Sequence, residues 1–462
     1  MKQDNILKEI EQNLSNAPDL TVRELSNATI LFFDSITDSK TINYILRNIA
    51  HLNKRQTKKL IDHVPHNTVE MINESDIVNK LNNGFMIVIT NYNIIACDVK
   101  GELTRAIAEP TTEPVVNGPK DAFVENIMMN LGLIKRRIKT NSLRAIDVEV
   151  GVHTETTVKV LYVEDIAKKK YVDKIVNKLN KIDIDGIFDS GYIKNYLEDS
   201  STFPTILSTE HPDLTAASLL EGKIVIMVDN SPFVLISPSF FVDFLHSADD
   251  YTQKGLNVSL TRVFRTLAFI ISVVMPGVYI AISAFNHSSI PAPLMLNILI
   301  QRIAVPIPSI FEGLMMLIFF EILREGDLRM PAKIGASISI VGALILGDAA
   351  VSAGITSPIM VIIIAITAIC SSVFNSTDML NAIRWWRITI LLFAAVSGLV
   401  GVYLGVILLL ARICSLKSNG VPYLTPMAPA SIEGLKDSFI LLPKNKRRKR
   451  SSLLSDNLIR ER

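Results

Sequence analysis

The sequence is poor in cysteine: Cys97, Cys370 and Cys414 are its only examples in 462 residues. An odd number of widely separated cysteines does not suit a disulfide framework, and none of the spacings matches a metal site. We therefore interpret the three as free thiols in a reducing compartment, and we expect no bound metal.

Motifs that carry chemistry are also missing. The sequence has no glycine-rich phosphate loop with its lysine, no helix with paired histidines and no serine nucleophile elbow. Its histidines are scattered, and each is more simply a surface or core residue than a ligand. These absences indicate a protein that is not an enzyme, and nothing predicts a cofactor or a nucleic-acid partner.

The chain does contain a sharp change of character near Arg262. The preceding residues are mixed and charged, whereas Thr266–Ala411 is largely apolar. The N-terminus lacks an apolar signal region, so we expect the first 260 residues to lie in the cytosol. This arrangement predicts a soluble region joined to a polytopic membrane domain and excludes an ordinary soluble enzyme.

The C-terminal tail is strongly basic. From Arg412 onward there are 11 basic and 4 acidic residues, and the run Lys446–Arg450 is entirely basic. An excess of lysine and arginine after the last membrane span predicts a cytosolic tail. Such a tail could contact anionic membrane lipid or simply remain solvated.

The soluble region alternates strand-like and helix-like segments. Residues 85–90 and 94–100 resemble a hairpin, and 158–163 resembles a strand that precedes a helix at 167–179. The pattern predicts two small α/β subdomains, at residues 1–150 and 151–260.

The membrane domain, residues 261–411, should contain four or five helical spans. Thr266–Phe285 and Ile388–Ala411 each have enough uncharged residues to cross a bilayer. A third uncharged region, Ile334–Thr377, is interrupted only by Asp348 and suggests a hairpin of two spans. Pro291–Pro331 carries several charges, so we expect a helix that lies in the interface or against the bundle. An even number of spans would put the basic tail, residues 412–462, on the same side as the soluble region.

Small residues recur at helical spacing in two places: Gly335, Ser339, Ala343 and Gly347 form one stripe, and Gly401 and Gly405 form another. Close packing between helices in lipid depends on such small side chains. We therefore predict that both stripes are helix contacts.

Polar residues inside a membrane are costly and invite a functional interpretation. Asp348 could bind a cation at a pore mouth or lie at a wet span end. Met360, Ile364, Thr367 and Ser371 share one helix face. In a ring of subunits this face could line a narrow pore, where apolar side chains exclude water. The alternative is an ordinary bundle core.

Several blocks of the sequence resemble the A subunit of GerA-type spore germinant receptors. The residues that carry the resemblance include Arg105–Glu125, Asn130–Lys139, Asp185–Ile193, Ser208–Asp213, Phe319–Gly326 and Gly342–Gly354. They occur in order over nearly the whole chain.

The resemblance implies a multi-pass protein of the spore inner membrane with a two-part cytosolic region. It also implies B and C subunits as partners and a homo-oligomeric ring that conducts ions when nutrient binds. We therefore expect a subunit of a nutrient-gated cation channel. The alternatives are a transporter of a small solute, which would show broken helices and an internal repeat, and a non-conducting scaffold for the other subunits.

Overall fold

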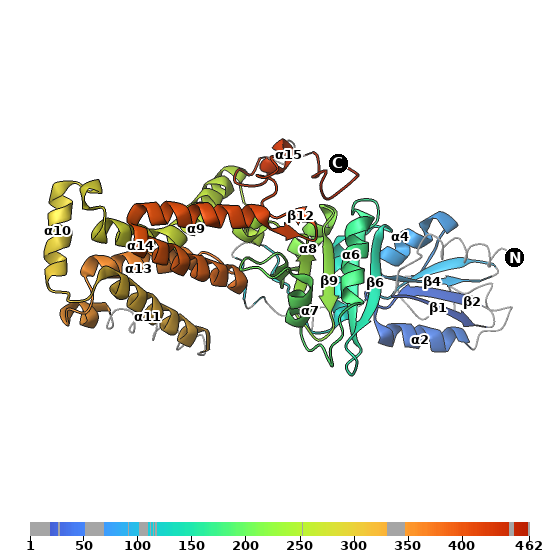
Figure 1. Ribbon diagram of the computed structural model, residues 1–462. Coiled ribbons are helices and arrows are strands. Elements are labelled where there is room, and N and C mark those ends of the chain that lie inside the picture. Colours follow the sequence, from blue (N-terminus) through green and yellow to red (C-terminus); the bar gives the residue numbers. More distant parts are fainter. Residues whose placement is uncertain are drawn as a thin grey trace.

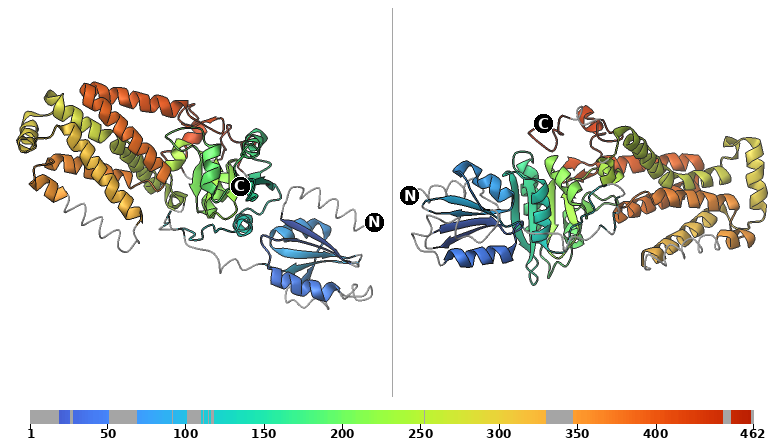
Figure 2. Two further views of the ribbon diagram at one scale, coloured as in Figure 1. Left: turned by 60° about the horizontal axis from the view of Figure 1, so that its bottom comes forward. Right: turned by 180° about the vertical axis from the view of Figure 1, so that it is seen from behind.

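The structure is a computed structural model that describes residues 19–25, 28–50, 69–90, 92–100, 110, 112–113, 115, 118–251, 253–329, 347–442 and 448–460. Two α/β units and a helical part follow one another along the long axis of the molecule (Figure 1). The views in Figure 2 show the same order, with the helical part at the end opposite the N-terminus. The predicted fold class, two small α/β subdomains followed by an all-α region, is confirmed.

The first unit is an antiparallel five-stranded sheet with the strand order β1-β2-β4-β5-β3. Its strands are β1 (Leu20–Leu25), β2 (Ala28–Phe33), β3 (Val69–Met71), β4 (Phe85–Ile89) and β5 (Ile94–Asp98). Helices α2 (Ser39–Ala50) and α4 (Ile77–Asn82) contribute to two separate apolar clusters that share this sheet. Since consecutive strand residues point to opposite faces, each face of the sheet buries one cluster.

The second unit repeats this topology, with the strand order β6-β7-β9-β10-β8. Its strands are β6 (Leu143–Val150), β7 (Thr156–Val163), β8 (Leu207–Thr209), β9 (Ile224–Val228) and β10 (Val234–Ser237). Its helices are α5 (Ile127–Arg137), α6 (Lys169–Leu179), α7 (Ser190–Leu197) and α8 (Pro212–Leu220). Glycines with positive φ precede the corresponding strands, at Gly84 before β4 and at Gly222 before β9.

The second unit begins earlier than the boundary expected at residue 150. Strand β6 pairs along its whole length with β7, from Leu143 with Val163 to Val150 with Thr156. Helix α5 lies before β6 and packs into the core of the same unit. The stretch that separates the two sheets therefore lies between β5 and α5.

The helical part contains α9 (Gly255–Ala284), α10 (Ala292–Ile303), α11 (Ser309–Arg329), α13 (Pro358–Ser371) and α14 (Thr377–Ser415). A further helical stretch covers residues 347–352. Among the described helices, α9 and α14 are long and apolar enough to cross a membrane. Short α10 lies at the end farthest from the α/β units (Figure 1), and α11 packs against α9 and α13. One helix was expected in this charged stretch, in the interface or against the bundle, and the described residues contain two, of which α11 packs against the bundle.

Helix α14 is a hairpin rather than the single span expected at Ile388–Ala411. Gly398 has φ 61° and ψ −139°, which breaks the helix into two arms. Both arms return to the second α/β unit: Lys194 forms an ion pair with Asp378 in the first arm, and Arg412 at the end of the second donates to the carbonyl of Ser200 at 3.1 Å. Glycine permits this reversal because it lacks a Cβ.

The chain after α14 folds back onto the second unit. Strands β11 (Lys417–Ser418) and β12 (Val421–Pro422) form a small hairpin, followed by α15 (Ile432–Leu435). Residues 448–460 then dock against the same unit, where Leu454 is buried in its core and Tyr171 donates to the carbonyl of Leu453 at 3.1 Å. The described tail is therefore docked, which differs from the solvated tail considered above.

One hydrophobic core crosses from the second unit into the helices. It includes Leu161 and Val225 of the sheet together with Val273 of α9 and Ile390 of α14. Five aromatic rings lie at the crossing, with centroids 5.1–6.5 Å apart: Phe203, Phe241, Phe269, Phe374 and Tyr423. Because well-packed cores transmit displacement, the second unit and the helices should move together.

Candidate functional site

The predicted pore face of α13 lies inside the protomer. Met360, Ile364, Thr367 and Ser371 are all buried. Met360 and Ile364 pack among side chains of α9, α11 and α14: Tyr279, Ile280, Met316, Leu317 and Leu391. The hydroxyl of Thr367 donates to the Ile364 carbonyl at 2.7 Å, and that of Ser371 donates to the Thr367 carbonyl at 2.9 Å. This arrangement corresponds to the bundle-core alternative, because the hydroxyls are satisfied by their own helix.

The opposite face of α13 points out of the protomer and is apolar. Ile362 and Ile369 are 56% and 70% exposed, and Ala365 lies between them. Such a face must contact lipid, another subunit or the narrow pore of a ring when the helix is in a membrane.

Asp348 is exposed, on the helical stretch 347–352 that precedes α13. The turn that follows lies at the far end of the bundle, because a Cβ added to Gly354 would lie 2.9 Å from the carbonyl oxygen of Ala304, directly after α10. Gly347 is buried beside Val361. Gly335, Ser339 and Ala343 lie outside the described residues.

The second glycine stripe packs within α14 itself. A Cβ added to Gly401 would lie 1.9 Å from the carbonyl oxygen of Phe393, and one added to Gly405 would lie 2.9 Å from Cγ1 of Ile390. The two glycines therefore let the arms of the α14 hairpin approach each other closely. Their contact is intramolecular, which the spacing alone could not reveal.

Glu312 is a fully buried carboxylate of the helical part. Its Oε1 accepts from the hydroxyl of Thr356 at 3.0 Å and from the backbone N–H and hydroxyl of Ser357, both at 2.6 Å. Because Ser357 is the N-cap of α13, the carboxylate ties α11 to the start of that helix. Arg302 donates instead to the Ser283 carbonyl at 3.3 Å, and the described residues contain no ion pair between Arg302 and Glu312.

A charged cluster lies between the second half of α11 and the first arm of α14. Glu321 Oε2 is 2.8 Å from Arg384 Nη2 and 3.7 Å from Arg324 Nη1, and Glu321 Oε1 is 3.9 Å from Arg387 Nη1. Glu321 and Arg324 lie in the block Phe319–Gly326 that carries the family resemblance, whereas the sequence analysis did not single out Arg384 and Arg387. The sequence feature that could have identified these two arginines is their position immediately before the apolar run Ile388–Ala411.

Buried charges also join α9 to the second α/β unit. Arg262 is 1% exposed, and its Nε donates to Asp250 at 2.9 Å while Nη1 donates to Asp437 at 3.1 Å. His246 Nε2 donates to the Ser438 carbonyl at 2.9 Å. Burial and the nearby Arg262 guanidinium hold the pKa of His246 well below its usual range. Arg262, which marks the change of character in the sequence, is therefore a buried structural contact in the fold.

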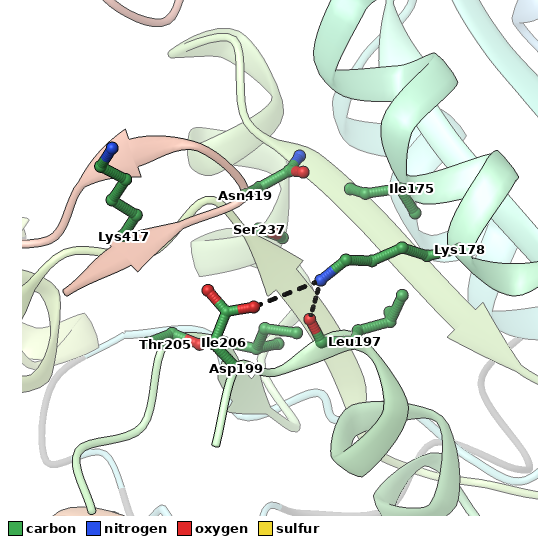
Figure 3. Close-up of a pocket in the computed structure, with 9 residues that line it drawn as sticks. All are labelled: Ile175, Lys178, Leu197, Asp199, Thr205, Ile206, Ser237, Lys417 and Asn419. Atoms are coloured by element: carbon green, nitrogen blue, oxygen red, sulfur yellow. Dashed lines mark hydrogen bonds and ion pairs between the residues drawn. The ribbon is translucent and has the colours of Figure 1, made fainter. Parts of the chain in front are cut away.

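A small pocket lies where the β11–β12 hairpin meets the second unit (Figure 3). Lys178 reaches across it, donating to the Leu197 carbonyl at 2.7 Å and lying 3.7 Å from Asp199. The cavity volume is about 10 Å³, which is about the space of one water molecule. The pocket is therefore a packing junction rather than a ligand site. Among the described residues, no group of three histidine, cysteine or acidic side chains could hold a metal.

Comparison with known proteins shows that the chain matches one protein family over nearly its whole length. Residues 8–453 match the model of the Bacillus/Clostridium GerA spore germination protein. The spore germination protein KA of Bacillus subtilis is 42% identical over 351 residues, which cover 76% of this chain and 64% of that protein. GerLA of Bacillus cereus is 32% identical over 98% of this chain and 96% of its own length. A solved structure is also similar: the crystal structure of the N-terminal domain of the A subunit of the Bacillus megaterium spore germinant receptor GerK3. Its sequence is 31% identical, the match covers 51% of this chain and 94% of that domain, and the TM-score is 0.40. The family match and the relatives confirm the resemblance in the sequence, and the chain belongs to the GerA family of spore germination proteins.

Proposed function

We propose that this protein is the A-type subunit of a nutrient-responsive germinant receptor in the spore inner membrane, working with B and C subunits. The helical part spans the bilayer, and the α/β units and the docked tail lie in the cytosol. Support for this topology comes from the start of α9 and the end of α14: Arg262 of α9 donates to Asp437, which follows α14, and Arg412 of α14 donates to the Ser200 carbonyl. A chain with both soluble segments on one face of its bundle crosses the membrane an even number of times.

We further propose that copies of this subunit assemble into a ring that conducts cations. The observation that carries this proposal is a helical hairpin made of the stretch 347–352 and α13. Asp348 is exposed on the first helix of this hairpin, and Ile362 and Ile369 are exposed on the outward face of the second. A ring of carboxylates attracts cations, and a ring of isoleucines closes a pore by excluding water.

The buried face of α13 has a different role in this proposal. Met360 and Ile364 hold α13 against its neighbours within one protomer, so they transmit movement rather than contact ions. Nutrient bound to a partner would shift the equilibrium between two packings of the bundle. The core that continues into the second α/β unit would carry that shift to the cytosolic side.

The experiment that tests the channel is conductance of the receptor reconstituted in liposomes with its B and C subunits, before and after nutrient. Asp348→Asn should lower cation conductance, whereas Ile362→Ala should allow leak without nutrient. Ile407→Ala, on an exposed position of the second arm of α14, is the matched control and should change neither. A correctly assembled receptor that stays electrically silent would instead indicate a docking scaffold.

A further inference from the structure

The charged cluster between α11 and α14 has more positive than negative charge. Arg324, Arg384 and Arg387 surround one carboxylate, that of Glu321. Two further acidic residues follow on α11: Glu325 forms its own ion pair with Arg329 at 2.7 Å, and Asp327 is exposed. The segment 330–346, which follows α11, contains Lys333 and no aspartate or glutamate. The amino-acid sequence therefore leaves that segment without a carboxylate to neutralise the cluster.

The arginines are also incompletely satisfied. Arg387 is 2% exposed and donates its Nε to the Ser272 carbonyl at 2.7 Å, but its Nη1 has no hydrogen-bond partner among the described residues. The buried Nε of Arg384 likewise has none within that part of the chain. A buried N–H group of a guanidinium that lacks an acceptor is costly, so an anion that accepts from these two atoms would be stabilised.

The cluster lies at the level where the helices leave the second α/β unit. Trp386 donates to the hydroxyl of Thr202 at 3.1 Å, which marks that boundary, and neighbouring Trp385 is 62% exposed. Tryptophan at this position is typical of the membrane–water interface, where lipid phosphates lie. Guanidinium groups match the geometry of a phosphate because they donate parallel hydrogen bonds to its oxygens.

We propose that Arg384 and Arg387, together with Arg324, bind the phosphate group of an anionic lipid headgroup. This site rests on the proposed membrane location but not on conduction. The phosphate accepts from the Arg387 Nη1 and the Arg384 Nε, and it competes with the Glu321 carboxylate for the same arginine side chains. A lipid headgroup of the inner leaflet thereby connects α11 to the first arm of α14.

Tryptophan fluorescence reports this site directly, because Trp385 and Trp386 are the chain's two tryptophans. The full-length protein would be placed in phosphatidylcholine nanodiscs and supplied with brominated phosphatidylglycerol or brominated phosphatidylcholine, which quench nearby tryptophan. We expect brominated phosphatidylglycerol to quench at a concentration about fivefold lower. Incorporation into phosphatidylcholine discs tests the membrane location independently of this preference.

Three variants distinguish a phosphate site from a structural cluster. Arg384→Gln should reduce the preference for phosphatidylglycerol about fivefold. Glu325→Gln combined with Arg329→Gln removes the neighbouring ion pair as a unit, so no carboxylate is freed, and it should leave the preference unchanged. Glu321→Gln should strengthen it, because the competing carboxylate charge is lost. If Arg384→Gln fails to fold, Glu321→Gln decides the question by the sign of its effect.

Four results would overturn the proposal. Equal quenching by the two lipids, or an effect of the combined Glu325→Gln and Arg329→Gln change as large as that of Arg384→Gln, would exclude a specific site. Relief of quenching by inorganic phosphate at a concentration equal to that of the lipid would indicate a site for free phosphate instead. A change of oligomer size in Arg384→Gln, accompanied by loss of the preference, would show that these arginines pair with a carboxylate of a neighbouring copy.

Discussion

Gly401 lies against the backbone carbonyl of Phe393. The two residues are eight positions apart in what the sequence predicts to be one continuous helix. A Cβ at Gly401 would lie 1.9 Å from that oxygen. The contact exists because Gly398 reverses α14, and it turns one expected span into two antiparallel arms. Both arms then reach the second α/β unit, which places the two ends of α14 on one side of the bundle.

Gly401→Ala should therefore destabilise the α14 hairpin. The added methyl group meets backbone on the opposing arm, which cannot rotate away, so we expect a loss of about 1–3 kcal/mol. Gly326→Ala is the matched control, because a Cβ at Gly326 of α11 meets nothing within 4 Å. It should be neutral or stabilising, since alanine favours a helix over glycine. Thermal unfolding of the two purified proteins in detergent measures both effects, and equal midpoints would contradict the hairpin.

Ile364→Ala distinguishes the bundle core from a pore lining. If Ile364 fills the core between α13 and its neighbours, truncation leaves a cavity and costs about 2–5 kcal/mol. The same truncation at Ile369, which is 70% exposed, should cost little. The measurement is thermal stability together with liposome conductance. If the Ile364→Ala receptor leaks ions but keeps its thermal stability, the Met360–Ser371 face would line the pore after all.

The fold class could be predicted from the sequence because hydrophobic periodicity and the change near Arg262 are local signals. The sequence also predicted which residues share one face of α13, because this depends only on spacing along a single helix. These residues are Met360, Ile364, Thr367 and Ser371. Whether that face points inward or toward another copy depends on neighbours far away in sequence. Spacing contains no information about those neighbours.

Other features were hidden for related reasons. The reversal at Gly398 leaves hydropathy unchanged, so an apolar run of 24 residues reads as one span. The two α/β units share a strand order, which became apparent only from the strand pairing. The docking of Arg450 inside a basic run was likewise hidden, because charge composition predicts solvation rather than burial.

The ion pair between Asp19 and Lys135 joins the two α/β units. The Lys135 Nζ lies 2.5 Å and 2.7 Å from the two Asp19 oxygens, and the Asp19 side chain is fully buried. Asp19→Asn would leave a buried ammonium without its partner and should cost about 3–5 kcal/mol. Asp19→Asn combined with Lys135→Met should cost less than the sum of the single changes. Denaturant unfolding gives the coupling, and additive effects would show that the pair does not connect the units.

Arg450 should hold the tail against the second α/β unit. Its Nε donates to the Leu220 carbonyl and its Nη1 to the Ile459 carbonyl, each at 2.8 Å. Arg450→Ala should weaken docking by about 1.5–3 kcal/mol, the usual range for hydrogen bonds from a charged group. Lys449→Ala removes the adjacent, exposed basic side chain and is the control. Protease cleavage within residues 448–460 should accelerate in the first variant alone; equal rates would indicate a tail held by other contacts.

His246 should make the junction between α9 and the second unit sensitive to acid. Its ring faces Arg262, Lys223 and Arg265, and burial with these positive charges lowers its pKa in the folded protein. The unfolded chain therefore binds a proton more readily, near a pKa of about 6.5. The contribution of His246 to stability is complete above that pH and declines as the pH falls toward the lower folded value, by up to about 1.4 kcal/mol per pH unit. His246→Gln, whose amide can still donate to the Ser438 carbonyl, should flatten the fall in unfolding temperature between pH 7 and pH 5. His153→Gln, at an exposed histidine, should retain the full slope, and a wild-type slope in His246→Gln would assign the acid sensitivity to other groups.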